Sequence, residues 1–270
     1  MSESSYVEAN IERFTGFAEV YDAYRPAVPI VIVDILTQLA RTPRPRCVVD
    51  LGSGTGLSTR IWANRADQVI GIEPSDPMRR VAEARSTDLA TVRYQAGLST
   101  ATGLPDACAD VVTASQSLHW MEPVGTFAEV ARLLRPGGVF AAIDNDWPPT
   151  FDWEAEALDQ AFMVSVSKLT AERHFDPDVK RWPKDKHLER MQASGHFRYT
   201  QEGTAHHVEQ GSAERMVGVA LSQASVQTLL KHGMTEAQIG LPEFRAEARR
   251  ILGDGSQPWY FSYRLRIGVK

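Results

Sequence analysis

Residues 48–57 read VVDLGSGTGL. A short apolar run typical of a buried strand, interrupted by Asp50, is followed by three glycines at alternate positions, Gly52, Gly54 and Gly56. A strand that runs into glycines and then into a helix places backbone N–H groups and the positive end of the helix at the carboxyl edge of a parallel sheet. Open α/β folds bind their ligands at that edge. The stretch therefore predicts a ligand-binding turn.

The spacing of the glycines narrows the ligand class. The dinucleotide fingerprint is GxGxxG, whose last glycine lets the helix pack closely while the helix start holds a pyrophosphate. Here the spacing is GxGxG, and Leu57 occupies the sixth position. Glu73 ends the next predicted strand about 20 residues later, where such folds place an acid that accepts hydrogen bonds from ribose hydroxyls. A nucleoside with a short carboxylate-bearing arm fits this pattern better than a dinucleotide.

Composition and charge indicate a folded protein, and they give no sign of a nucleic acid or a membrane as partner. The 270 residues are 43% hydrophobic and 23% charged, enough for one large domain or a domain with a subdomain. The net charge of -5 and the lack of a basic stripe argue against nucleic acid. The start of the chain does not read as a secretory signal, and no run reaches the roughly 18 apolar residues of a membrane span. Cys47 and Cys108 lack metal-ligand spacing and read as reduced thiols, which suits a cytoplasmic protein.

Alternation of short apolar runs with amphipathic segments sets the expected architecture. Strands are expected at 47–51, 68–73, 91–96, 109–115 and 139–144, with helices over 28–39, after 57 and 76, and over about 127–134. This order predicts an α/β fold with a doubly wound, mostly parallel sheet covered on both faces. We expect residues 46–146 to form the ligand-binding core.

The spacing of apolar residues along the sequence changes after residue 146. Residues 147–253 are mostly helical in pattern, near 154–169, 213–231 and 242–252, with one strand-like interruption near 196–204. The closing residues 254–270 alternate in part between apolar and polar side chains, as a strand does. We interpret 147–253 as a helical insertion or cap and 254–270 as the strand that returns to complete the sheet. No metal-binding residues are predicted, because the adjacent pair at 206–207 has no evident third ligand.

Four ordered blocks carry a family resemblance: VVDLGSGTG at 48–56, GIEPSDPM at 71–78, GLPDACADVVTASQSLHWM at 103–121 and LLRPGGVF at 133–140. Together they resemble the class I S-adenosylmethionine-dependent methyltransferases, in particular the small-molecule group called type 11. The resemblance covers residues from about 10 to 146. It implies a Rossmann-like seven-stranded sheet, S-adenosylmethionine as cofactor, and transfer of a methyl group to a small-molecule acceptor.

The resemblance also implies the cofactor contacts. By position in the motifs they are Asp50, Gly52, Gly54, Gly56, Glu73, Pro74, Met78, Thr100, Ala101, Thr102, Ser115, Tyr21 and Arg25. The glycines would pass the methionine arm, and Asp50 would brace their loop or meet the amino group through water. Glu73 would hold the ribose hydroxyls, and Pro74 and Met78 would flank the adenine. The acid that often marks the adenine amine is missing before Leu-Pro, so the Thr102 hydroxyl or the backbone at 100–101 would replace it.

Two further roles are implied near the acceptor. His119 leaves the fourth strand at its carboxyl end and is the candidate general base, or else it packs under the cofactor. Residues 13–26 resemble the family's leading segment, so 1–45 would comprise a lid and the leading helix. Tyr21 and Arg25 would close over the cofactor's carboxylate and sulfonium, or their helix merely packs on the domain.

Two other functions stay open at this point. A protein that binds the cofactor without catalysis, as a regulator or scaffold, would keep every motif. An NAD-dependent oxidoreductase would need the glycine that Leu57 replaces. We expect the segment 147–253, with the N-terminal segment, to select a small acceptor. Neither the acceptor, the atom that is methylated nor the oligomeric state follows from the sequence.

Overall fold

Within the described residues, 3–175 and 177–270 of a computed structural model, seven strands form one sheet in the order β3-β2-β1-β4-β5-β7-β6. Their bounds are β1 Val48–Leu51, β2 Val69–Ile72, β3 Val92–Gln95, β4 Ala109–Ser115, β5 Leu134–Asn145, β6 Tyr199–Gly211 and β7 Gln257–Val269. The first five pair in parallel, and β7 runs antiparallel to β5. The predicted doubly wound, mostly parallel sheet is confirmed.

The chain divides into two compact units. The sheet unit comprises Ala27–Asn145, Lys180–Ala205 and Tyr263–Lys270, and the helical unit comprises Met1–Pro26, Asp146–Val179 and His206–Ser262. The segment 147–253, expected as one insertion, thus contributes to both units. The expected N-terminal segment 1–45 is divided in the same way, between Pro26 and Ala27.

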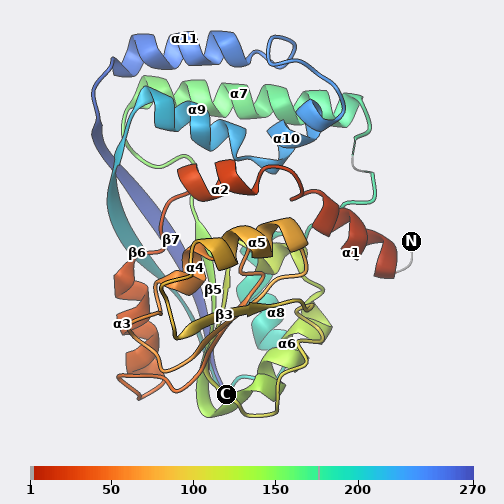
Figure 1. The fold of residues 1–270 in the computed structure, drawn as a ribbon, viewed down its shortest axis with the longest axis vertical. Coiled ribbons are helices and arrows are strands. Elements are labelled where there is room, and N and C mark those ends of the chain that lie inside the picture. Colours follow the sequence, from red (N-terminus) through yellow and green to blue (C-terminus); the bar gives the residue numbers. More distant parts are fainter. Residues whose placement is uncertain (1–2, 176) are drawn as a thin grey trace. The chain divides into compact units, whose positions relative to one another are not determined.

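In the sheet unit, helices cover both faces of the sheet. They are α3 Ile30–Leu39, α4 Leu57–Arg60, α5 Asp76–Ala84, η1 Leu118–Trp120, α6 Pro123–Leu133, η2 Lys184–Lys186 and α8 His187–Ala193. Figure 1 shows α3 on one side of the strands and α6 with α8 on the other. All residues of β1 and β2 are buried, as expected for parallel strands covered on both faces. Phe140 of β5 packs against Phe127 and Phe197, with its ring centroid 6.0 Å from each of theirs.

Register brings the motifs of the sequence to one edge of this sheet. Leu51 is paired with Ile72, so β1 and β2 end side by side. The N–H groups of Gly52 and Ser53 donate to the Ile72 carbonyl over 2.8 and 3.1 Å. The glycine loop after β1 and Glu73 after β2 therefore begin at the same level of the sheet.

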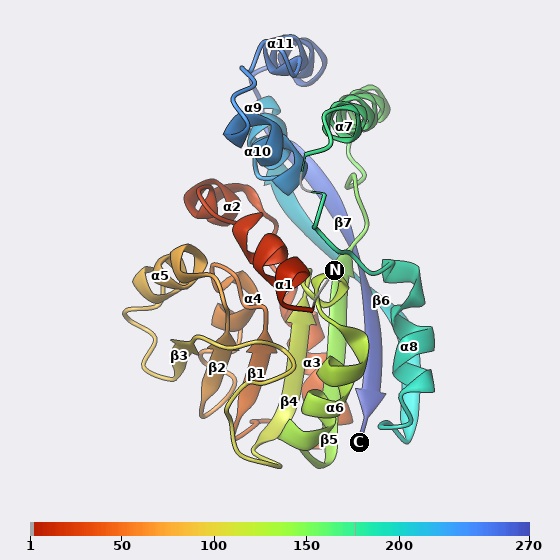
Figure 2. The ribbon, with the colours of Figure 1, turned by 90° about the vertical axis from the view of Figure 1, so that its right-hand side faces the viewer.

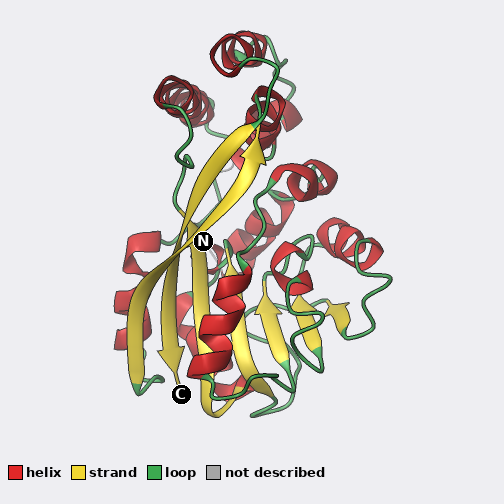
Figure 3. Ribbon diagram, turned by 90° about the vertical axis from the view of Figure 1, so that its left-hand side faces the viewer, coloured by secondary structure: helices red, strands yellow, loops and turns green. Residues whose placement is uncertain are grey.

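The helical unit is built mainly from helices, with parts of β6 and β7 (Figures 2 and 3). Its helices are α1 Glu3–Glu12, α2 Ala18–Tyr24, α7 Trp153–Glu172, α9 Ala213–Leu221, α10 Ala224–Lys231 and α11 Leu241–Leu252. Phe162 of α7 stacks on Phe244 of α11 with 4.4 Å between ring centroids, and α2 packs on α9. The helix expected over 213–231 is broken at Gln223, whose backbone is extended. No described helix is long and apolar enough to cross a membrane.

Candidate active site

The three glycines of the loop between β1 and α4 serve different purposes. A Cβ on Gly52 would lie 2.7 Å from the Ser117 Cβ, and one on Gly56 would lie 2.3 Å from the Tyr94 hydroxyl. Close packing therefore requires glycine at both positions. At Gly54 the backbone φ is +55°, and a Cβ would meet nothing within 4 Å. Of the three, Gly54 is the glycine whose missing side chain leaves open space.

Asp50, at the end of β1, fixes the glycine loop through hydrogen bonds of its side chain. Its fully buried carboxylate accepts hydrogen bonds of 2.7 Å from the hydroxyls of Ser58, Thr59 and Thr113. Burial raises the pKa of Asp50, and the three hydroxyl donors oppose that rise. These bonds connect β1 to the first turn of α4 and to β4, so they support the bracing role. A contact between Asp50 and a cofactor amino group stays a prediction.

Glu73 connects the glycine loop to the turn after β2. One carboxylate oxygen accepts from the Gly54 N–H and the other from the Ser75 N–H, both over 2.9 Å. Burial raises the pKa of Glu73, and the two backbone donors oppose this. A carboxylate has about four lone-pair positions, so two remain for further donors such as a ribose diol.

Three buried hydroxyls beside this loop have no hydrogen-bond partner among the described residues: those of Ser53, Thr55 and Ser75. Their residues are at most 5% exposed. Buried polar groups are nearly always hydrogen-bonded, so orphan hydroxyls here indicate a missing polar ligand or water. Together with the open space at Gly54, they fit the cofactor that the motifs imply. These hydroxyls were not predicted as site residues, although Ser53 and Thr55 alternate with the motif glycines and Ser75 follows Pro74.

Of the residues expected to contact the adenine, one already uses its side chain in a hydrogen bond within the protein. Met78 on α5 is 2% exposed and lies four residues after Pro74. The backbone N–H and the hydroxyl of Thr102 both donate to Glu129, over 2.9 and 2.5 Å. The Thr102 hydroxyl is thus engaged within the protein. This favours the backbone at Thr100 and Ala101 for the adenine amine, and the contact itself stays a prediction.

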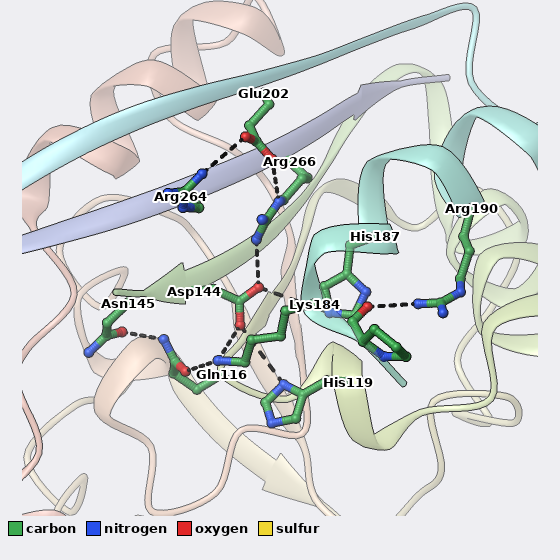
Figure 4. Close-up of polar contacts among 11 residues, drawn as sticks. Gln116, His119, Asp144, Asn145, Lys184, His187, Arg190, Glu202, Arg264 and Arg266 are labelled. Atoms are coloured by element: carbon green, nitrogen blue, oxygen red, sulfur yellow. Dashed lines mark hydrogen bonds and ion pairs between the residues drawn. The ribbon is translucent and has the colours of Figure 1, made fainter. Parts of the chain in front are cut away.

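An ion-pair network around the buried side chains of Asp144 and Arg266 lies at the ends of β4 and β5 (Figure 4). The two Asp144 oxygens each lie 2.9 Å from a cation, one from Lys184 Nζ and the other from Arg266 Nη1. Lys184 also donates to the Gln116 side chain over 2.8 Å, and Arg266 to Glu202 over 2.6 Å. The network connects β5, β6, β7 and the loop after β4 with η2. In the sequence, Asp144 is one of three polar residues that end the fifth expected strand, any one of which is a candidate to bind the acceptor, and nothing there indicates an ion-pair network.

His119, the candidate base, lies against this network. Its side chain is 4% exposed, its Nδ1 lies 3.9 Å from an Asp144 oxygen, and its ring centroid lies 4.8 Å from that of Trp120. Ser115, which ends β4, is paired with Ile143 of β5. A base role for His119 and a cofactor contact for Ser115 stay predictions.

His119, Asp144 and His187 also bring three potential metal-ligand atoms within 4.8 Å of one another. Both carboxylate oxygens of Asp144 are already bound by cations, which would repel a metal ion at the same point. We therefore describe these residues as a part of the ion-pair network and assign no metal to them.

Burial of His187 predicts a pH-dependent stability. The side chain is 2% exposed, and burial lowers its pKa to about 4, against 6.5 for an ordinary histidine. Between these pH values the unfolded chain binds more protons than the folded one, so stability falls as the pH falls. We expect a loss of roughly 2 to 3 kcal/mol between pH 7 and 4 from this residue.

Urea unfolding of wild type and His187→Gln at pH 7 and pH 4 measures this contribution. The variant should show a smaller loss at low pH, whereas His196→Gln, at an exposed histidine, should follow wild type. An identical loss for His187→Gln and wild type would contradict the assignment of the effect to His187.

Tyr21 and Arg25 lie in the helical unit. Arg25 donates from Nη2 to the Ser222 carbonyl and to the Gln223 side chain, each over 2.9 Å. Its guanidinium carbon lies 4.9 Å from the Tyr21 ring centroid and 5.6 Å from that of Trp147. Arg25 therefore ties the end of α2 to the end of α9. The lid role of Tyr21 and Arg25 stays a prediction.

Comparison with known proteins is consistent with this geometry. Residues 49–142 match a family model described as a methyltransferase domain. An uncharacterized methyltransferase of Mycobacterium tuberculosis is 34% identical over 145 residues, which cover 53% of this chain and 56% of that protein. The trans-aconitate 2-methyltransferase of Acidovorax ebreus is 37% identical over 120 residues, 43% of each chain. The chain thus spans about half the length of the curated relatives it matches.

A solved structure matches most of the fold. It is that of a candidate type II methyltransferase from Anaeromyxobacter dehalogenans, with a TM-score of 0.65. The alignment covers 91% of this chain and 98% of that one at 22% sequence identity. At this identity the match supports the fold.

Proposed function

We propose that this chain is a class I S-adenosylmethionine-dependent methyltransferase that methylates a small-molecule acceptor, because residues 49–142 match the model of a methyltransferase domain. One observation carries the cofactor part of this proposal. The loop after β1 combines open space at Gly54 with three buried hydroxyls that lack partners, next to a carboxylate with two unused acceptor positions.

Each part of that loop has a separate task. Glu73 accepts hydrogen bonds from the ribose hydroxyls while it keeps the Gly54 N–H in place. Gly54 leaves room for the methionine arm, and Asp50 fixes the first turn of α4 below it. Pro74 and Met78 flank the adenine. The loop is thereby shaped before the cofactor arrives, which lowers the entropy lost on binding.

The chemistry asks little more of the protein. S-adenosylmethionine supplies an activated methyl group on a sulfonium. The protein has to hold the acceptor in line and exclude water, and such positioning can contribute roughly 7 to 11 kcal/mol. A carboxylate acceptor would need no base. For a phenol, an amine or a carbon acid, His119 would accept the proton, with the Asp144 carboxylate 3.9 Å from its Nδ1.

A small acceptor is supported by the relatives and by the composition of the chain. One relative is a trans-aconitate methyltransferase, whose acceptor is a small organic acid. The net charge of -5 does not favour nucleic acid as an acceptor. We propose that the helical segments of 147–253, with Tyr21 and Arg25, select the acceptor.

Incubation with methyl-labelled S-adenosylmethionine and a metabolite extract, followed by mass spectrometry, tests this function. A labelled small molecule that forms only with active protein is the expected result. Tight binding of S-adenosylhomocysteine without any labelled product would indicate the non-catalytic alternative. Binding of NADH in its place would indicate an oxidoreductase.

Replacement of Glu73 by alanine should weaken S-adenosylmethionine binding. The change removes a buried carboxylate that serves both the ribose and the Gly54 N–H, at a cost of roughly 1.5 to 3 kcal/mol. Calorimetry should therefore show an affinity about ten to a hundred times lower. Glu83→Ala, at an exposed acid of α5, is the matched control. Equal affinities for the two variants would remove Glu73 from the ribose site.

A further inference from the structure

A short basic segment of the sheet unit, residues 180–184, reads KRWPK and lies at the ends of β4 and β5. The Trp182 N–H donates to the His119 carbonyl over 2.9 Å. At the other end of the segment, Lys184 donates to the Gln116 side chain over 2.8 Å. The segment is thus attached at two points to the loop that follows β4, next to the candidate base.

Arg181 of this segment is a cation without a carboxylate of its own. Within residues 3–175 and 177–270, its guanidinium makes no hydrogen bond and no ion pair. Asp144 is the carboxylate that acts on its charge, but the two Asp144 oxygens already lie 2.9 Å from Lys184 and Arg266. Burial lowers the pKa of Arg181, yet part of the residue is exposed to solvent. An anion from solution can therefore reach the guanidinium.

The ring of Trp120 positions this guanidinium beside the candidate base. The guanidinium carbon of Arg181 lies 5.4 Å from the Trp120 ring centroid, and that centroid lies 4.8 Å from the centroid of His119. The face of an indole attracts a cation at such a distance. A guanidinium over an aromatic ring can still use the N–H donors in its own plane to bind a ligand.

Positive charge exceeds negative charge within this network, although the whole chain has a net charge of -5. The network in Figure 4 contains two carboxylates and three cations, and Arg181 adds a fourth cation: Asp144 and Glu202 lie among Lys184, Arg264, Arg266 and Arg181. His187 is neutral at pH 7, because burial lowers its pKa to about 4. A surplus of cations raises the local concentration of anions.

We propose, on the basis of the methyl transfer proposed above, that the acceptor is an organic anion whose carboxylate or phosphate group binds to Arg181. A guanidinium forms two parallel hydrogen bonds with two oxygens of such a group. Because Trp120 holds the guanidinium beside His119, the bound anion orients the acceptor relative to the candidate base. Arg181 thus determines which acceptors bind, and it takes no part in the transfer of the methyl group.

Anion-exchange fractionation of the metabolite extract tests the charge of the acceptor. Each fraction is incubated with the full chain and methyl-labelled S-adenosylmethionine, and labelled product should form from the retained, anionic fraction. Treatment of that fraction with alkaline phosphatase before the assay removes a phosphate acceptor and spares a carboxylate. Product from the unretained fraction alone would overturn the anionic acceptor and leave the methyltransferase proposal intact. No product from any fraction would contradict the methyltransferase proposal and, with it, the anionic acceptor.

Variants of Arg181 test its role with the acceptor from the active fraction. Arg181→Gln should lower kcat/KM at least about tenfold, through a higher KM, because a charged hydrogen-bond donor is lost. Arg181→Lys keeps the charge and should recover part of the loss. Arg198→Gln, at an exposed arginine whose N–H donates to Val269 at the end of β7, should match wild type.

S-adenosylhomocysteine should bind all three variants with wild-type affinity, which shows that the cofactor loop is folded. An unchanged KM in Arg181→Gln would overturn the contact between Arg181 and the acceptor. Equal losses in Arg181→Gln and Arg181→Lys would show that packing on Trp120, and not charge, is what Arg181 contributes, and would overturn it as well.

Discussion

Gly54→Val is expected to abolish S-adenosylmethionine binding while the sheet remains folded. A Cβ at Gly54 meets no protein atom within 4 Å, so the valine methyl groups would fill the space left for the methionine arm. The expected loss exceeds about a hundredfold, because the ligand and the side chain cannot occupy the same space. Calorimetry with S-adenosylhomocysteine measures the loss, and circular dichroism confirms the fold.

Backbone strain has to be separated from this steric effect. Gly54 has a φ of +55°, which valine adopts only at a cost. Gly195 has a φ of +70° and equally open surroundings, so Gly195→Val carries a similar strain outside the loop. It should bind the cofactor like wild type. If Gly54→Val is folded and still binds, the open space at Gly54 is not the methionine site.

The fold and the cofactor loop could be predicted because their signals are local. The strand, the glycines and Leu57 are consecutive, and Glu73 follows at a fixed interval along the same βαβ unit. Parallel pairing then brings both to one edge, since Leu51 and Ile72 are in register. Short continuous apolar runs between helical patterns are enough to place such strands within a few residues.

The ion-pair network could not be predicted, because its members come from distant segments. Asp144 follows an apolar strand, Lys184 lies in a polar stretch that was interpreted as insertion, and Arg266 lies in the final strand. Nothing local in the sequence indicates that two cations meet one carboxylate.

The division of the chain into two compact units could not be predicted from local sequence patterns either. The strand expected near 196–204 extends over Tyr199–Gly211, and β6 and β7 each contribute residues to both units. The alternation of side chains along a strand indicates which residues share a face, but it does not indicate how long the strand is. The break in the helix at Gln223 could not be predicted either, because the spacing of apolar residues continues through it.

The second large effect is expected for the free energy of unfolding, when Asp50 is replaced by alanine. Asp50→Ala should lower the free energy of unfolding by about 3 to 5 kcal/mol, because the hydroxyls of Ser58, Thr59 and Thr113 lose their common acceptor in a buried site. Urea unfolding measures the change. Because Asp50 braces β1 against α4 and β4, we expect this loss in the absence of any cofactor.

A double-mutant cycle with Thr113→Val distinguishes the brace from a direct cofactor contact. In wild type, Thr113→Val removes one of the three bonds and should cost about 1 kcal/mol. In the Asp50→Ala background the same change removes only an orphan hydroxyl, so it should cost nothing or stabilise, which gives a coupling of about 1 to 2 kcal/mol. If Asp50 instead serves the amino group of the cofactor, Asp50→Ala would leave the unfolding midpoint near wild type and lower the affinity for S-adenosylhomocysteine. The three hydroxyls aimed at the carboxylate make the first outcome the expected one.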